Sequence, residues 1–325
     1  MRKTLIKPLF FCVLTLTAAS AFADLTQADS AKVQALYERR NTHAKEGNYD
    51  NLIEDFTEIL KIKPDGLMDL FSRGLTYANK GNYDKAIEDY NAALKIKPDF
   101  QFALHSRGNA YAAKGNYDKA IEDFTTAIKI NPNAWFMPYN LYERGLAYAT
   151  KGNYDRAIED YTAALKIKPD GHKALSKRGD AYEAKGNYDK AIEDYTAAIR
   201  VEPDVFYYFK RGDAYYEKGN YDKAIEDFST AIKINPDFRF AILNRGRAYL
   251  DKGNYDMAIE DFTSILNFNP NFQNALHNRG IAYYEKGNYD KAINDLEAAL
   301  KIDPNDTNAK QLLEEIRQKK QERSK

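Results

Sequence analysis

The phrase KGNYDKAIEDY, at residues 80–90, recurs with small changes in eight copies along the chain, the first of which reads KEGNYDNLIED at residues 45–55. Its glycines are separated by 34, 34, 37, 34, 33, 34 and 34 residues, and a proline follows each glycine by 17 residues. A period of this length is typical of arrays of helical hairpins. The chain of 325 residues is therefore predicted to be one elongated array rather than two ordinary domains.

Each copy of the phrase marks the second helix of a hairpin. Between Gly81 and Pro98 the apolar residues recur at three- and four-residue steps, which is the spacing of one helix face. Upstream, Leu70, Gly74 and Tyr77 keep the same spacing, and this first helix is predicted to end at Gly81. Two helices per period follow.

A glycine lies inside the first helix of every copy except the first, where Arg40 replaces it. Such a glycine costs about 1 kcal/mol relative to alanine, so a close contact between the two helices is expected to offset the loss. An alanine of the second helix, such as Ala86, is predicted to let the two backbones approach closely, and a tyrosine such as Tyr77 is predicted to fill the space beside them. The first copy has Arg40, and Leu52 in place of the alanine, and is predicted to be a half-solvated terminal repeat.

An arginine stands just before that glycine in the first helices, and an aspartate is equally regular in the second helices. An arginine this close to a helix interface needs a partner for its charge. We predict a structural ladder of Arg–Asp pairs, and we prefer this role to ligand binding because a ligand site would hardly need all eight arginines. The ladder comprises Arg39, Arg73, Arg107, Arg144, Arg178, Arg211, Arg245 and Arg279 with Asp55, Asp89, Asp123, Asp160, Asp194, Asp227, Asp261 and Asp295.

The repeated unit resembles the tetratricopeptide repeat (TPR) family. The resemblance rests on the pattern Leu-x2-Arg-Gly-x2-Tyr, then Gly-Asn-Tyr-Asp-x-Ala-Ile-x-Asp, an aromatic residue, x2-Ala and Pro, and it covers residues 33–306 in eight copies. It implies an all-α fold, a right-handed superhelical solenoid of eight helix-turn-helix TPR hairpins, with a capping helix and tail at residues 307–325. The arginine is a departure, because the family commonly has leucine there. Members of the family usually bind peptide segments or partner proteins and serve as scaffolds.

The resemblance also implies a concave groove lined by the first helices, and here that groove is expected to be rich in aromatic residues. Such side chains offer a large apolar area and, in tyrosine, a hydrogen-bonding tip, which suits an extended peptide. About a third of the candidates are expected to pack between neighbouring helices instead. The candidates are Tyr37, Met68, Phe71, Phe102, His105, Tyr139, Tyr142, Phe206, Phe209, Tyr216, Phe240, His277 and Tyr284, beside the polar residues Asn109, Lys173, Lys177, Asp180, Lys210, Asp213, Arg247 and Glu285.

The spacing is irregular at residues 132–144 and 203–211. Three extra residues in the first of these segments accompany the only tryptophan, Trp135, and are expected to disturb the stacking of the array. Trp135, Phe136 and Met137 form either a partner-binding protrusion or a filling for the gap that the insertion creates.

The first 23 residues differ from all that follow. Basic residues precede an apolar run from Leu9 to Ala19, and Ala21-Phe22-Ala23 closes the segment, which is the pattern of a cleaved signal peptide. The run is shorter than the roughly 20 residues that a membrane span needs. We therefore expect an exported protein, periplasmic or else secreted, whose mature chain begins with a lead-in at residues 24–32 and has no membrane span.

Charge and motifs argue against most chemistry. The 48 basic and 48 acidic residues give no electrostatic reason to expect nucleic acid or an acidic membrane as the main ligand. The chain has four histidines and one cysteine, and it lacks the G-x-S-x-G, H-E-x-x-H and phosphate-loop motifs. We therefore predict that it is not an enzyme and that it binds no metal and no cofactor.

The leading hypothesis is a non-enzymatic scaffold of the bacterial cell envelope that binds a partner protein or an extended peptide. An envelope carbohydrate- or peptidoglycan-binding protein and a noncatalytic subunit of an envelope enzyme complex are the alternatives. The sequence identifies neither the partner nor the oligomeric state.

Overall fold

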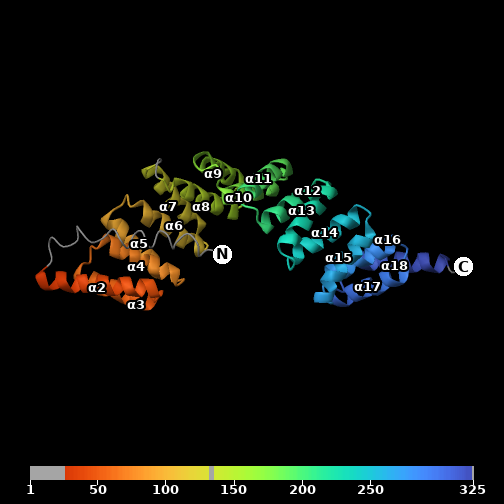
Figure 1. Ribbon diagram of the computed structural model, residues 1–325, viewed down its shortest axis with the longest axis horizontal. Coiled ribbons are helices and arrows are strands. Elements are labelled where there is room, and N and C mark those ends of the chain that lie inside the picture. Colours follow the sequence, from red (N-terminus) through yellow and green to blue (C-terminus); the bar gives the residue numbers. More distant parts are fainter. Residues whose placement is uncertain (1–25, 132–134, 324–325) are drawn as a thin grey trace. The chain divides into compact units, whose positions relative to one another are not determined.

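The computed structural model describes residues 26–131 and 135–323, so the predicted signal peptide lies outside the described part (Figure 1). Seventeen α-helices and no strand are found in the described part. The helices are α2 (Gln27–Glu46), α3 (Tyr49–Ile62), α4 (Leu67–Asn79), α5 (Tyr83–Ile96), α6 (Gln101–Ala113), α7 (Tyr117–Ile130), α8 (Met137–Thr150), α9 (Tyr154–Ile167), α10 (His172–Ala184), α11 (Tyr188–Val201), α12 (Val205–Glu217), α13 (Tyr221–Ile234), α14 (Arg239–Asp251), α15 (Tyr255–Phe268), α16 (Gln273–Glu285), α17 (Tyr289–Ile302) and α18 (Thr307–Arg323).

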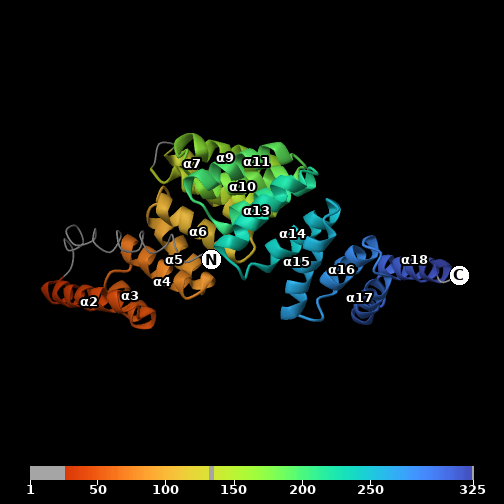
Figure 2. The same ribbon diagram turned by 45° about the vertical axis from the view of Figure 1, so that its right-hand side comes forward.

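The helices form eight hairpins, with an even-numbered first helix and an odd-numbered second helix in each, and α18 follows the last. The chain divides into two compact units, Met1–Pro169 (unit 1) and Asp170–Lys325 (unit 2). Within each unit, successive helices pack side by side, as Figures 1 and 2 show. The all-α solenoid predicted from the period is confirmed.

The insertion near Trp135 does not interrupt this packing. The helices on either side of it, α7 and α8, contact each other as other successive helices do. The division between the units instead falls after Pro169, where the spacing in sequence is regular. The expectation that the insertion disturbs the stacking is wrong for this pair of helices.

The repeated Gly-Asn turn joins the two helices of each hairpin. Gly81 takes a left-handed conformation with φ 80°, and the N–H of Asn82 donates to the Tyr77 carbonyl at 2.9 Å. The Asn82 side chain then accepts from the N–H of Lys85 at 3.3 Å and so caps the second helix. Glycine ends the first helix because it adopts positive φ without a steric penalty.

The space beside the first-helix glycine is filled by a ring of the second helix. A Cβ atom at Gly108 would lie 2.7 Å from Cε1 of Phe124, and Gly74 stands in the same relation to Tyr90. The prediction of a close approach is confirmed, but the filling residue is not the expected tyrosine. Tyr77 is partly exposed, and the ammonium group of Lys85 lies 5.3 Å from its ring centroid.

Most of α2 is exposed, as predicted for a half-solvated terminal repeat, but the two substituted positions, Arg40 and Leu52, are buried. Arg40 is 3% exposed, and its guanidinium lies 4.6 Å from the ring centroid of Tyr37. The hydroxyl of Tyr37 donates to buried Asp69 of α4 at 3.1 Å, and Leu52 is fully buried. The next hairpin therefore covers the place where the first repeat lacks its glycine.

At the other end, α18 packs against α17 through buried Ala309, Leu313 and Ile316. This confirms the capping helix. Among the described residues, no helix combines the length and apolarity required to cross a membrane.

Candidate functional site

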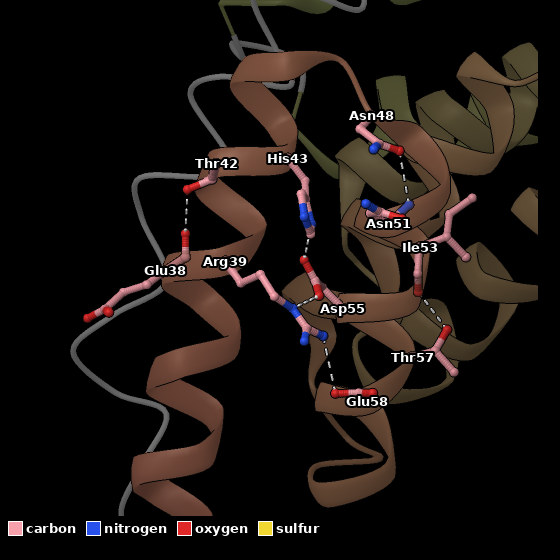
Figure 3. Close-up of polar contacts among 10 residues, drawn as sticks. All are labelled: Glu38, Arg39, Thr42, His43, Asn48, Asn51, Ile53, Asp55, Thr57 and Glu58. Carbon is pink, nitrogen blue, oxygen red and sulfur yellow. Dashed lines mark hydrogen bonds and ion pairs between the residues drawn. The ribbon is translucent and has the colours of Figure 1, made fainter.

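The predicted Arg–Asp contacts are present in all eight hairpins. In the first, Arg39 Nε donates to Asp55 Oδ1 at 2.5 Å, and the other Asp55 oxygen lies 2.8 Å from His43 Nδ1 (Figure 3). In the later hairpins the guanidinium binds both carboxylate oxygens, as for Arg73 and Asp89 at 2.9 and 2.7 Å. Burial raises the pKa of Asp89, and the hydrogen bonds from Arg73 oppose the shift.

The ladder arginines have a further contact that sequence reasoning missed. Arg73 Nη1 donates to Thr57 Oγ1 of the preceding hairpin at 3.1 Å, and Arg211 donates to Thr196 Oγ1 in the same way at 3.0 Å. Each of these arginines thus joins the second helix of its own hairpin to the second helix of the hairpin before it. A signal was available, because Thr, Ser or Asn recurs two residues after the ladder aspartates.

The first helices of unit 2 carry a connected row of polar side chains, which we call the polar row. On α10, the carboxylates of Asp180 and Glu183 lie 2.9 and 2.7 Å from the hydroxyl of buried Tyr195, and they share its single proton. Lys210 of α12 lies 3.6 Å from Asp180 and 3.7 Å from Glu183. The row continues on α12, where Asp213 accepts from Asn244 Nδ2 of α14 at 2.7 Å.

The polar row ends at a hollow of ≈ 450 Å³ on α12, α14 and α16, lined in part by Tyr216, Arg247, Asp251 and Glu285. The guanidinium of Arg247 lies 5.0 Å from the ring centroid of Tyr216, whose hydroxyl donates to Asp251. The hollow therefore offers an aromatic face, a cation and carboxylates at its surface. Burial, aided by the hydrogen bond to Asp251, raises the pKa of Tyr216 to about 12, so the hydroxyl keeps its proton at neutral pH.

Within the polar row, Asp213 has a pKa that is clearly shifted toward neutrality. Burial raises its pKa to about 6, and the hydrogen bond from Asn244 opposes that effect. Glu183 raises the pKa further, while Lys210 and Arg247 lower it. A change of pH between 5 and 7 therefore changes the charge of the row.

In unit 1, His105 is held by two amides. Its Nδ1 lies 2.7 Å from Asn140 Oδ1, and its Nε2 lies 3.0 Å from Asn109 Nδ2. An acceptor at Nδ1 and a donor at Nε2 define the neutral tautomer protonated on Nδ1. Burial lowers the pKa of His105, which agrees with a neutral ring.

The aromatic groove candidates are dispersed. Tyr37 and Phe71 are buried in the core of unit 1, so their assignment to an open groove is wrong. Phe206 and Phe240 are exposed and lie around Phe238, at centroid distances of 5.4 and 6.1 Å. The candidates Met68, Phe102, Tyr139, Tyr142, Phe209, Tyr216, His277 and Tyr284 are half-buried.

Two of these candidates bind the C-terminal segment. His277 Nδ1 lies 3.0 Å from Asp306 Oδ2, and the hydroxyl of Tyr284 donates to Glu315 of α18 at 2.6 Å. Both side chains therefore help to hold the capping helix in place.

The aromatic residues of the insertion divide between its two suggested roles. Phe136 is 6% exposed and stacks on Phe102 at 4.9 Å, so it fills the gap, as does half-buried Met137 at the start of α8. Trp135 is 69% exposed and meets the rings of Phe136 and Tyr139 edge-on at 5.6 and 6.4 Å. Trp135 is the residue that protrudes.

Comparison with known protein families matches this chain to the tetratricopeptide repeat family. Models described as tetratricopeptide repeat and TPR repeat match residues 70–100, 102–134, 142–204, 176–237, 246–287 and 274–306. No curated protein matches the chain.

Solved structures with the same fold include two from named bacteria. The C-terminal part of a TPR repeat-containing protein from Cytophaga hutchinsonii is 24% identical, with a TM-score of 0.64 over 74% of this chain and 97% of that one. A tetratricopeptide repeat protein from Parabacteroides merdae is 22% identical, with a TM-score of 0.56 over 77% and 98%. YrrB, described as a TPR protein with an unusual peptide-binding site, is 21% identical, with a TM-score of 0.50 over 57% and 95%.

Proposed function

Because the chain belongs to the tetratricopeptide repeat family, we propose that it is a non-enzymatic scaffold that binds an extended peptide segment of a partner protein. The observation that carries the proposal is the polar row of unit 2 with its adjoining hollow. Tyr195 and Asn244 hold the carboxylates of the row in place, and Arg247 lies over Tyr216. Donors and acceptors that alternate along several helices suit a peptide backbone, which carries one donor and one acceptor at most residues.

The site is ordered before any ligand arrives. Side chains that are already fixed lose little conformational entropy on binding, so more of the contact energy appears as affinity. Tyr216 and Arg247 belong to the residue types that most often dominate binding energy at interfaces. We assign them the largest share in peptide binding.

A peptide display library selected on the purified chain tests this proposal, followed by calorimetry with a selected peptide. Tyr216→Ala should weaken binding at least tenfold. Its matched control is Tyr215→Ala, the neighbouring tyrosine of the same helix, which lies under Lys223 with the ammonium 5.2 Å from the ring centroid and does not line the hollow. Circular dichroism verifies that both variants are folded. Equal loss in both variants, or selection of glycans in place of peptides on a parallel array, would contradict the proposal.

We further propose that the scaffold works in the bacterial cell envelope, with the periplasm preferred to full secretion. The support is the sequence of residues 1–23, with its basic start, apolar run and Ala-Phe-Ala end. N-terminal sequencing of the protein recovered from fractionated cells should find Asp24 first. A chain in the cytoplasm that starts at Met1 would refute export.

A further inference from the structure

The turns that follow α5, α7 and α9 in unit 1 form a surface that we call the turn edge. Each of these helices ends with a lysine and an isoleucine, and each isoleucine is exposed: Ile96 by 45%, Ile130 by 38% and Ile167 by 50%. Trp135, at 69% exposed, stands in the middle turn. Large apolar side chains are therefore presented to solvent at three successive turns.

Contacts between neighbouring turns make the edge continuous. Gln101, just after the first turn, donates to the Ala127 carbonyl in the last turn of α7 at 2.8 Å. Phe102 stacks on Phe136 beside Trp135. The ammonium of Lys168 lies 5.9 Å from the ring centroid of Tyr139, which in turn contacts Trp135.

The turn edge is also basic. Its described residues, at 95–100, 129–131, 135–136 and 166–169, include five exposed lysines and one acidic residue, Asp99, and a second exposed aspartate, Asp170, follows directly. The corresponding turns of unit 2, at 200–204, 233–239, 267–272 and 301–306, hold four basic and five acidic residues. The charge balance of the whole chain thus conceals a local positive excess in unit 1.

We propose that the turn edge of unit 1 docks on the surface of an anionic lipid bilayer. The lysines complement the charge of the head groups, and the isoleucines and Trp135 enter the interfacial layer, where tryptophan is the favoured aromatic residue. Phe136 and Tyr139 hold the Trp135 ring outward, so the edge needs no rearrangement to bind.

A nucleic acid is the less suitable partner for the same charges. Proteins that bind single strands combine cations with several aromatic stacking faces. The turn edge has one exposed aromatic ring and three exposed aliphatic side chains, which bases do not recognise and lipid chains do.

The only tryptophan of the chain lies in the proposed contact, so its fluorescence reports on that contact directly. The full chain is mixed with phosphatidylcholine vesicles with and without phosphatidylglycerol, and the emission and acrylamide quenching of Trp135 are followed. Vesicle binding alone is not the readout, because the apolar residues 9–19 are present in every variant and have an affinity for lipid of their own. The test variant is Lys95→Gln, Lys129→Gln, Lys166→Gln, and its matched control is Arg200→Gln, Lys233→Gln, Lys301→Gln at the same repeat positions of unit 2.

We expect phosphatidylglycerol vesicles to shift the Trp135 emission to shorter wavelength and to protect it from quenching. High salt should reverse this effect. The test variant should need about a hundredfold more lipid for the same change, since each lysine near an anionic surface raises the binding affinity about fivefold. The control variant should behave like the parent. Three results would overturn the proposal: an emission that no vesicle changes, an equal loss in both variants, or a change produced by single-stranded RNA and not by vesicles.

Discussion

At the scale of single residues, the regular side chains were predictable and the singular ones were not. The ladder pair of Arg211 and Asp227 could be anticipated because it recurs in every period. Asp213 could be named as a polar neighbour of the groove, but its altered pKa could not, since that depends on burial by non-repeating residues of three helices. A repeat reveals what the copies share, whereas the surface that binds a partner lies where they differ.

The half-buried carboxyl of Asp213 is expected to contribute to the pH dependence of stability. Its pKa of about 6 in the folded chain exceeds the unfolded value of about 3.9, so the folded state holds the proton more tightly. Its contribution is favourable at low pH and is lost as the pH rises through 6. Between pH 5 and pH 7 the parent should therefore lose free energy of unfolding that Asp213→Asn does not lose, a difference on the order of 1 to 2 kcal/mol in favour of the variant.

Urea unfolding at both pH values and constant ionic strength measures this difference. Asp237→Asn, an exposed aspartate of the same unit, is the control and should show no such gain. If Asp213→Asn tracks the parent at both pH values, the carboxyl is not protonated in the fold.

At the scale of helices, the sequence predicted that the first-helix glycine marks a close approach, but it identified the wrong neighbour. The closest atoms belong to the aromatic residue of the second helix, as in the pair of Gly108 and Phe124. Helical periodicity assigns residues to a face but does not say which side chain of that face meets a given backbone atom. The expectation that Tyr77 fills this space failed for that reason.

The close contact predicts the effect of adding one methyl group. Gly108→Ala places a Cβ 2.7 Å from the fully buried Phe124 ring, and overpacking of this kind costs about 1–3 kcal/mol. The higher helix propensity of alanine stabilises the variant by about 1 kcal/mol, so a net loss of roughly 1 kcal/mol in the free energy of unfolding is expected. Gly280→Ala, whose Cβ would meet Leu296 Cγ at 3.0 Å, should lose less. Thermal unfolding of the two variants gives the comparison, and a stabilised Gly108→Ala would show that the ring moves aside freely.

At the scale of the whole molecule, the period established the array and its cap. It could not show the division after Pro169, because the spacing on both sides of that point is regular. Nor could it show that the turn edge is basic in one unit and not in the other. Such an edge arises from small differences between turns, such as lysine in unit 1 where unit 2 has Glu202 or Asp303.

The ladder links neighbouring repeats, so its loss should be felt locally. Arg211→Met leaves Asp227, with 5% of its side chain exposed, without its cation and removes the hydrogen bond to Thr196 of α11. Removal of one partner of a buried pair costs about 3–5 kcal/mol. Because each repeat of a solenoid contacts only its neighbours, hydrogen exchange should accelerate at least a hundredfold in α11–α13 and stay unchanged in α3–α7.

Lys218→Met is the control for that experiment, since it removes another cation, directly after α12, that reaches the preceding hairpin. Its bond to Asp189 is exposed, with 38% and 76% of the two side chains accessible, and pairs of this kind contribute at most about 1 kcal/mol. The control should therefore leave exchange nearly unchanged. An equal rise in the exchange rate of every helix of the Arg211→Met chain would mean that the array unfolds as one cooperative body. No rise at all would contradict the structural role of the arginines and favour the alternative, ligand binding.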